Sequence, residues 1–380
     1  MSPSIHCGHS SASNATTAVQ ELYTQLADPQ TELVIFFCSS HYDLEALAFA
    51  INKLYTNIQV IGCTTAGEIG PQGYLVHSIC AASFSKCDFT SVSTCLDATK
   101  TLSPEATHTV INQLLASLDQ KSGPQSGGNR FALQLIDGLS QAEEWLSQLL
   151  QRALGKVPLI GGSAGDDLKM NSPQVFYQGC FHAHALVLVI IDSLCPIKIF
   201  KTQNFIAGRE PLVVTEADCN ARKILELNGL PAAEAYAHTL GIEIQALNAV
   251  IFASSPMVVQ LNGKLYVRSI QNSNPDGSLS FYCAIDRGMI LRIAQSVDLV
   301  SDLKSAFKQI ELTLGQPQLI IAFDCVLRRL DIERNNLAPQ IEAITRPYNT
   351  LGFNTYGEQF LGIHVNQTFT GIAIGHHPHG

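Results

Sequence analysis

The apolar and polar residues of this 380-residue chain follow two periods, one typical of strands and one typical of amphipathic helices. Their order occurs three times. Each time, a short apolar run precedes a helix-like stretch, a second apolar run enters a glycine-rich turn, and a further run follows the turn. The opening runs are Val34–Ser40, Leu133–Leu139 and Leu319–Cys325, and the closing runs are Leu75–Phe84, His182–Ile191 and Ile363–Ile374. The pattern predicts a repeated strand–helix–strand–turn–strand unit.

The three glycine-rich turns share one pattern. A glycine opens the turn, a hydroxyl residue lies inside it, and a glycine followed by a carboxylate closes it. The turns are Gly62–Glu68, Gly161–Asp166 and Gly352–Glu358, and the hydroxyl residues are Thr65, Ser163 and Thr355. The opening runs of the first two units are separated along the chain by the same number of residues as Ile61 and Ile160, which lie at the two corresponding turns. A unit of about 100 residues is longer than common solenoid repeats, so we expect a mixed α/β fold.

Helical periodicity is clearest in three segments, which are Ser11–Ala27, Asp43–Leu54 and Ala142–Leu154. The first has apolar residues along one face, and the third is amphipathic and contains the only tryptophan, Trp145. The second begins at an aspartate suited to cap a helix N-terminus. The second and third of these segments follow the opening run of a repeat, which is the position of the helix in the strand–helix–strand–turn–strand unit.

The composition changes near Gly208, where short alternating runs replace the repeated unit. These runs are Met257–Gln260, Lys264–Ile270 and Leu279–Ala284. Asn262-Gly263 is a hairpin signal between the first two, and Asn272–Ser278 is a turn before the third. We therefore predict an antiparallel meander inserted ahead of the third unit, and two domains at residues 1–208 and 209–380.

Composition and charge narrow the class of protein. The net charge of −9 argues against a nucleic-acid binder, whose surface is usually basic. The longest apolar run, Ala185–Ile191, is too short to span a bilayer, and Met1–Cys7 lacks the pattern of a signal peptide. The 11 cysteines are scattered without a C-x-x-C pair, which favours a reducing compartment over a disulfide framework. We expect a soluble cytoplasmic protein that binds neither nucleic acid nor membrane.

Several of these segments together resemble the FIST sensory family. The turns Gly62–Glu68 and Gly161–Asp166 are similar to its N-terminal half. Segments similar to its C-terminal half are Ile224–Ala232, Val267–Ile270, Phe323–Arg328, Gly352–Glu358 and Asn366–Thr370. The resemblance implies ligand sensing in bacterial signal transduction, beside or fused to kinase or cyclic-nucleotide output domains.

The length of the chain further resembles that of the stand-alone FIST hemoproteins that sense nitric oxide. That resemblance implies a bound haem b, detection of nitric oxide at the iron, and control of a separate histidine kinase in a two-component system. The other interpretation within the family is a haem-free sensor of a small, amino-acid-like metabolite. The sequence leaves the oligomeric state open, and a homodimer is one of the alternatives.

A haem site needs an axial ligand, most often histidine. We set aside the histidines near the termini and those in loop or cap-like settings, which are His6, His9, His376, His377, His379, His41 and His108. The remaining ones are His77, His182, His184, His238 and His364. Our hypothesis takes His238 and His364 as iron ligands and His182 as a pocket residue. Each is also compatible with an ordinary core or surface histidine.

The glycine turns offer a second kind of site. Their backbone amides could form an anion-binding concavity, but Glu68 and Glu358 put negative charge at the same place, which argues against phosphate. Arg268 is the candidate to pair with Glu358 or with a ligand carboxylate. The structural alternative is that the glycines supply positive φ and that the carboxylates cap neighbouring amides.

An enzyme is the competing class. Cys325 follows Asp324 at the end of an apolar run, and His364 lies on a later strand candidate, so a Cys–His pair is conceivable. Buried cysteines are usually inert, and the apolar run before Cys325 indicates burial. We therefore interpret the chain as a sensor and not as an enzyme, with a protein-interaction module as a third class.

Overall fold

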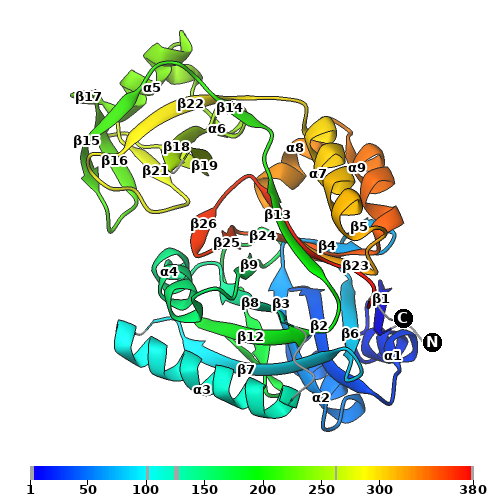
Figure 1. Cartoon of the computed structure of the whole chain (residues 1–380). Coiled ribbons are helices and arrows are strands. Elements are labelled where there is room, and N and C mark those ends of the chain that lie inside the picture. Colours follow the sequence, from blue (N-terminus) through cyan, green and yellow to red (C-terminus); the bar gives the residue numbers. More distant parts are fainter. Residues whose placement is uncertain (1–3, 100–101, 124–127, 262, 378–380) are drawn as a thin grey trace. The chain divides into compact units, whose positions relative to one another are not determined.

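The computed structural model describes residues 4–99, 102–123, 128–261 and 263–377, and these form two compact units (Figure 1). Unit 1 spans residues 1–202, 303–364 and 369–380, and unit 2 spans residues 203–302 and 365–368. Unit 2 is therefore inserted ahead of the third repeat, as the sequence pattern predicts. The division into two domains at residues 1–208 and 209–380, which was made from the sequence, stays a prediction. Asn262 and His379 lie outside the described residues, as do residues 1–3 of the predicted N-terminal segment.

The first sheet of unit 1 is built mainly from the first repeat. Its strands, in spatial order, are β1 (Ile5–Ser10), β6 (Ile79–Ser85), β2 (Thr31–Ser39), β3 (Gln59–Thr65), β10 (Val175–Tyr177) and β11 (Cys180–His182). Strands β2 and β3 are parallel, and β6 is antiparallel to β2. Helices α1 (Ala15–Leu26) and α2 (Leu44–Leu54) form the apolar core of this repeat together with β2. Asn14 caps α1 and Asp43 caps α2, so both predicted helices are confirmed.

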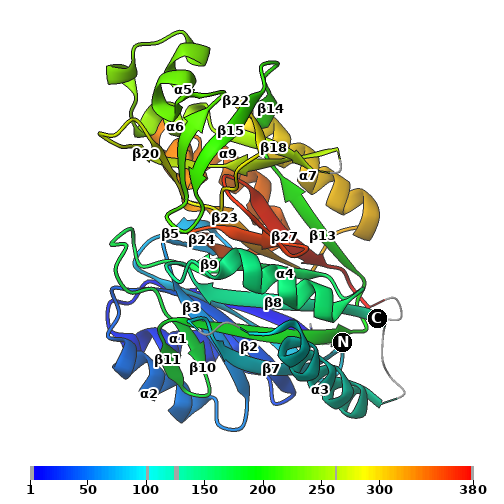
Figure 2. The ribbon, with the colours of Figure 1, turned by 90° about the vertical axis from the view of Figure 1, so that its left-hand side faces the viewer.

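The second sheet belongs mainly to the second repeat. Its strands are β26 (Ile363–Val365), β25 (Glu358–Phe360), β9 (Leu159–Ala164), β8 (Asn129–Asp137), β12 (Ala185–Ser193) and β7 (Phe89–Asp97). Helices α3 (Pro104–Ser122) and α4 (Glu143–Leu154) pack against it through a continuous apolar cluster (Figure 2). Helix α4 confirms the predicted amphipathic segment around Trp145, which is partly buried against this cluster.

The third sheet completes unit 1. Its strands are β13 (Ile197–Thr202), β27 (Phe369–Ile374), β23 (Leu319–Cys325), β24 (Thr350–Thr355), β4 (Glu68–Gly70) and β5 (Gly73–Leu75). The helices of this repeat are α7 (Leu299–Leu314), α8 (Val326–Arg334) and α9 (Ala338–Thr345). Phe37 from the first sheet packs against Phe323 and Phe353 from the third, with ring centroids 6.5 and 4.7 Å away.

Each glycine turn passes the chain from its own sheet to another. After the first turn, β4 and β5 join the third sheet, where β4 pairs with β24. After the second turn, β10 and β11 join the first sheet through β3, and after the third turn β25 joins the second sheet through β9. The three repeats therefore exchange these short strand pairs in a closed cycle.

The predicted closing strands are each two strands instead of one. The structure separates β5 from β6, β11 from β12, and β26 from β27. His77, His184 and Gln367 lie at these breaks with φ of 50°, 53° and 50°. A left-handed residue cannot continue an extended strand, which is why the single strands were the wrong prediction.

Unit 2 is mainly antiparallel. Its strands, in spatial order, are β19 (Lys264–Arg268), β18 (Met257–Leu261), β22 (Ile290–Ser296), β15 (Leu212–Asp218), β16 (Lys223–Leu227), β21 (Leu279–Phe281) and β20 (Ile270–Ser273). Strand β14 (Phe205–Ala207) adds to β22 and β17 (Leu230–Pro231) to β16, and the helices are α5 (Ala232–Leu240) and α6 (Ala249–Ser254). The β18–β19 and β20–β21 hairpins confirm the predicted antiparallel pairing. The predicted run Lys264–Ile270 breaks at Ser269, and its two parts, β19 and β20, lie at opposite ends of the sheet, so one continuous meander was the wrong prediction. The mixed α/β class is confirmed. None of the helices in the described ranges is both long and apolar enough to cross a membrane.

Candidate functional site

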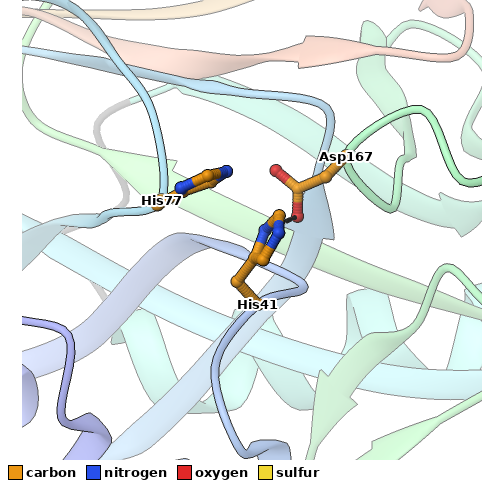
Figure 3. Close-up of side chains that lie close together, drawn as sticks. All are labelled: His41, His77 and Asp167. Atoms are coloured by element: carbon orange, nitrogen blue, oxygen red, sulfur yellow. Dashed lines mark ion pairs between the residues drawn. The ribbon is translucent and has the colours of Figure 1, made fainter.

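Three polar side chains, those of His41, His77 and Asp167, converge at one edge of the first sheet (Figure 3). The register of the strands explains why. Cys38 of β2 pairs with Ile79 of β6, so the end of β2 meets the start of β6, and His41 and His77 flank that meeting point. The first and second turns then bring in Asp167, because its backbone N–H donates to the carbonyl oxygen of Thr65 at 2.9 Å.

The three side chains are close enough to act on one ligand. One ligand atom from each residue lies within 4.8 Å of the others. The two imidazole rings have centroids 3.8 Å apart, and His41 Nδ1 lies 3.3 Å from Asp167 Oδ2. Both histidines are exposed and Asp167 is partly buried. The cluster is therefore open to solvent and has two imidazole nitrogens and one carboxylate, which are common metal ligands.

Asp167 is held by the residues at the end of β2. Its Oδ2 accepts hydrogen bonds from Ser39 Oγ at 2.9 Å, from Ser40 N at 2.8 Å and from Ser40 Oγ at 2.7 Å. Lys169 Nζ donates to Ser40 Oγ at 3.1 Å and contributes a nearby positive charge. These donors fix the orientation of the carboxylate. His41 follows Ser40 directly and approaches the carboxylate from the same segment, whereas His77 comes from the segment before β6.

A fully buried carboxyl group, that of Glu68 at the end of the first turn, is hydrogen-bonded to the residue that follows His77. Thr65 Oγ1 donates to Glu68 Oε1 at 2.5 Å, and the backbone N and Oγ of Ser78 donate to Oε2 at 3.2 and 2.6 Å. Burial raises the pKa of Glu68 to about 7, although these hydrogen bonds lower it in part. Ser78 follows His77 directly, so the buried carboxyl group and the exposed cluster share one short segment.

The carboxylates of the other two turns also accept local hydrogen bonds. Thr355 Oγ1 donates to Glu358 Oε1 at 2.5 Å, just as Thr65 donates to Glu68. Asp166 accepts from the backbone N–H groups of Met170, Asn171 and Ser172. Partial burial opposes ionisation of Asp166, but Tyr356 Oη and these N–H groups outweigh it and lower its pKa. The carboxylates therefore order the turns, and this supports the structural interpretation of the glycine pattern.

The predicted haem ligands occupy different settings. His238 is exposed on α5 in unit 2, whereas His364 is buried on β26 in unit 1. Gln359 Nε2 lies 3.4 Å from His364 Nδ1. His182 ends β11, and its Nε2 lies 3.1 Å from the carbonyl oxygen of Tyr177. Their roles as ligands stay predictions.

The remaining predicted residues are buried. Arg268 ends β19 in unit 2, and its proposed partner Glu358 belongs to unit 1, so their pairing stays a prediction. Cys325 is 2% exposed, ends β23 and is the N-cap residue of α8. Asp324 contacts Arg328 Nε at 2.9 Å and Tyr74 Oη at 2.7 Å. Burial raises the pKa of Asp324, and Arg328 works in the opposite direction. The carboxylate beside Cys325 is therefore engaged in a buried ion pair.

Two larger cavities lie in unit 1. One, of about 370 Å³, is lined by Ile51, Asn52, Tyr55, Thr56, Asn57, Ile58, Gln59, Val60, Ser93, Phe176, Tyr177, Gln178 and Gly179. The other, of about 230 Å³, is lined by polar residues that include Glu32, Lys86 and Lys121. Neither lining contains a histidine.

Sequence reasoning missed the histidine cluster. It set His41 aside as a loop residue, kept His77 without selecting it, and did not consider Asp167. Ser39, Ser40 and His41 at the end of an apolar run were the available signal. The missing information was the strand order, which brings together segments from two repeats.

Comparison with known families gives two matches. A model described as the FIST N domain matches residues 32–230, and a model described as the FIST C domain matches residues 232–361. No curated protein matches the chain.

Proposed function

The chain belongs to the FIST family, whose domains have a sensory role in signal transduction, and on this premise we propose that it binds haem b and detects nitric oxide. In this proposal it acts in the cytoplasm of a bacterium and reports to a separate histidine kinase or another signalling protein. Matches to both halves of the family, which together span most of the chain, carry the sensory role. FIST domains are sensory and not catalytic, which agrees with a protein that is not an enzyme.

The haem proposal assigns the iron to His238 or His364, with His182 and Arg268 near the cofactor. Bound haem would supply an iron that takes a diatomic gas as a ligand. The two cavities described above have no histidine in their linings. The support for haem is therefore the resemblance to the stand-alone hemoproteins, and we assign no chemical step to the iron.

An absorption spectrum tests the haem proposal. We expect a Soret band when the purified protein is supplied with haem, and a shift of the ferrous band on addition of nitric oxide. The band should change in His364→Ala or in His238→Ala. A protein without a Soret band refutes haem binding, and a ferrous spectrum indifferent to nitric oxide refutes gas sensing alone.

One observation favours a haem-free sensor of a small, amino-acid-like metabolite as the second candidate. The 370 Å³ cavity has a volume typical of small-ligand sites. Tyr55 lines it, is 8% exposed, and its hydroxyl group has no hydrogen-bond partner among the described residues. A buried hydroxyl group without a partner costs about 1–3 kcal/mol. The Tyr55 hydroxyl group is covered by protein atoms, so a polar ligand group would remove that cost once a side chain at the cavity wall moves aside.

A thermal-shift screen with the twenty amino acids tests this candidate. A binder should raise the melting temperature of the wild type, and Tyr55→Phe should weaken its binding because the variant lacks the hydroxyl group. Tyr23→Phe is the matched control, since Tyr23 packs edge-on against Tyr55 but does not line the cavity. Equal binding by wild type and Tyr55→Phe would assign the ligand to another place.

A further inference from the structure

The proposed function leaves the cluster of His41, His77 and Asp167 without a role. We propose that these three residues bind one divalent transition-metal ion of the zinc or ferrous-iron class. Two imidazoles with one carboxylate are a ligand set that such ions favour, and three protein ligands leave positions open for water or a small ligand. The inference is independent of haem, because none of the three residues is a predicted haem ligand.

The distances are close to those of a formed site. Ligand atoms bound to one zinc ion lie about 2.0–2.2 Å from it, which places them about 3–4 Å from one another. The ligand atoms of the cluster lie within 4.8 Å of one another. A contact of 3.3 Å between His41 Nδ1 and Asp167 Oδ2, the oxygen that Ser39 and Ser40 also engage, holds the imidazole beside the carboxylate. Both histidines are exposed, so side-chain rotation can close the remaining gap of about 1 Å without repacking the core.

The carboxylate is already oriented for such an ion. Oδ2 of Asp167 accepts three hydrogen bonds from Ser39 and Ser40, whereas Oδ1 accepts none from the described residues. Figure 3 shows Oδ1 on the side that faces His77. Hydrogen bonds that orient a ligating carboxylate are typical of the residues around metal sites. The positive charge of Lys169 is directed to Ser40 Oγ at 3.1 Å.

The second repeat provides an internal comparison. His184 also has left-handed backbone, at φ 53°, just before β12, and its Nδ1 lies 3.5 Å from Asp137 Oδ2. A left-handed histidine beside an aspartate is therefore a consequence of the fold and not in itself a metal site. The first repeat differs because His41 adds a second imidazole. Within the described ranges, no other group of three histidine, cysteine or acidic residues has this geometry.

Isothermal titration of the metal-free full-length protein with Zn²⁺ tests the proposal. His376 and His377 offer a second imidazole pair, so all proteins carry His376→Ala and His377→Ala. The variants are His77→Asn and Asp167→Asn, because asparagine tolerates the left-handed backbone at both positions, where φ is 50° and 55°. His184→Asn is the matched control, and Trp145 fluorescence confirms that each variant is folded.

We expect one Zn²⁺ per chain and at least a tenfold loss of affinity in His77→Asn and in Asp167→Asn, with no loss in His184→Asn. Co²⁺ should bind with a visible absorption band that the same two variants lose. Folded His77→Asn and Asp167→Asn that bind Zn²⁺ as tightly as the parent would overturn the proposal, and so would a folded parent without saturable binding. A missing Soret band would refute the haem proposal and leave the metal-site proposal intact. The failure of one proposal can therefore be distinguished from the failure of the other.

Discussion

Replacement of Glu68 by glutamine should remove a pH-dependent destabilisation of unit 1. Burial raises the pKa of Glu68 from its ordinary value of 4.5 to about 7 in the folded protein. Between these pH values the folded state holds a proton that the unfolded state releases. The free energy of unfolding therefore falls as pH rises from about 4.5 to about 7, and this contribution is constant above that range.

The size of the effect follows from the two pKa values. Their difference corresponds to about 3 kcal/mol, because one pKa step is worth about 1.4 kcal/mol. Glutamine is neutral at every pH, and its carbonyl oxygen can still accept the hydrogen bonds from Ser78. The stability of Glu68→Gln relative to the wild type should therefore rise by about 3 kcal/mol between pH 4.5 and pH 8.

Urea denaturation at the two pH values measures this difference, with the fluorescence of Trp145 as the probe of unit 1. The comparison between pH values cancels any pH-independent cost of the substitution. Glu45→Gln is the control, because Glu45 is exposed in the first turn of α2. A relative stability of Glu68→Gln that is the same at pH 4.5 and pH 8 would refute the assignment of a raised pKa to Glu68.

Three further predictions concern stability and use the same urea assay. Arg328→Met should lower the free energy of unfolding by about 3–5 kcal/mol, because it leaves the buried carboxylate of Asp324 without its ion-pair partner. Adding Asp324→Asn to this variant should restore most of the loss. An unchanged urea midpoint in Arg328→Met would contradict the buried ion pair. Gly67→Ala should cost about 1–3 kcal/mol, since Gly67 has φ 133° and an added Cβ would lie 2.9 Å from Arg329 Nη1; a neutral result would show that the turn adapts. Asp43→Ala should cost about 1 kcal/mol through loss of the α2 cap, and no change would mean that water replaces it.

Local patterns in the sequence predicted the elements that depend on nearby residues. Helix α2 begins where Asp43 can cap it, and β23 occupies the apolar run before Cys325. The breaks at His77 and Gln367 escaped prediction, because left-handed backbone is uncommon outside glycine and a single histidine or glutamine within an apolar run does not mark it. The pattern also predicted the repeats, but it contained no signal for the exchange of strand pairs between them.

The candidate site was harder to predict for a related reason. His41 and His77 come from the two ends of one repeat, and Asp167 comes from the next repeat. Only the register of β2 with β6 and the bond from Asp167 N to Thr65 O bring them together. Such contacts depend on tertiary structure, whereas the selection of His238 and His364 rested on position along the chain.

The cyclic exchange of strand pairs has a consequence for biosynthesis. While the ribosome has released only the first two repeats, β9 lacks its partner β25, and β4 lacks its partner β24. Unpaired strand edges of this kind favour pairing with other chains. Unit 1 can close only after β24 and β25 have emerged from the ribosome, so a nascent chain would need protection from aggregation until then.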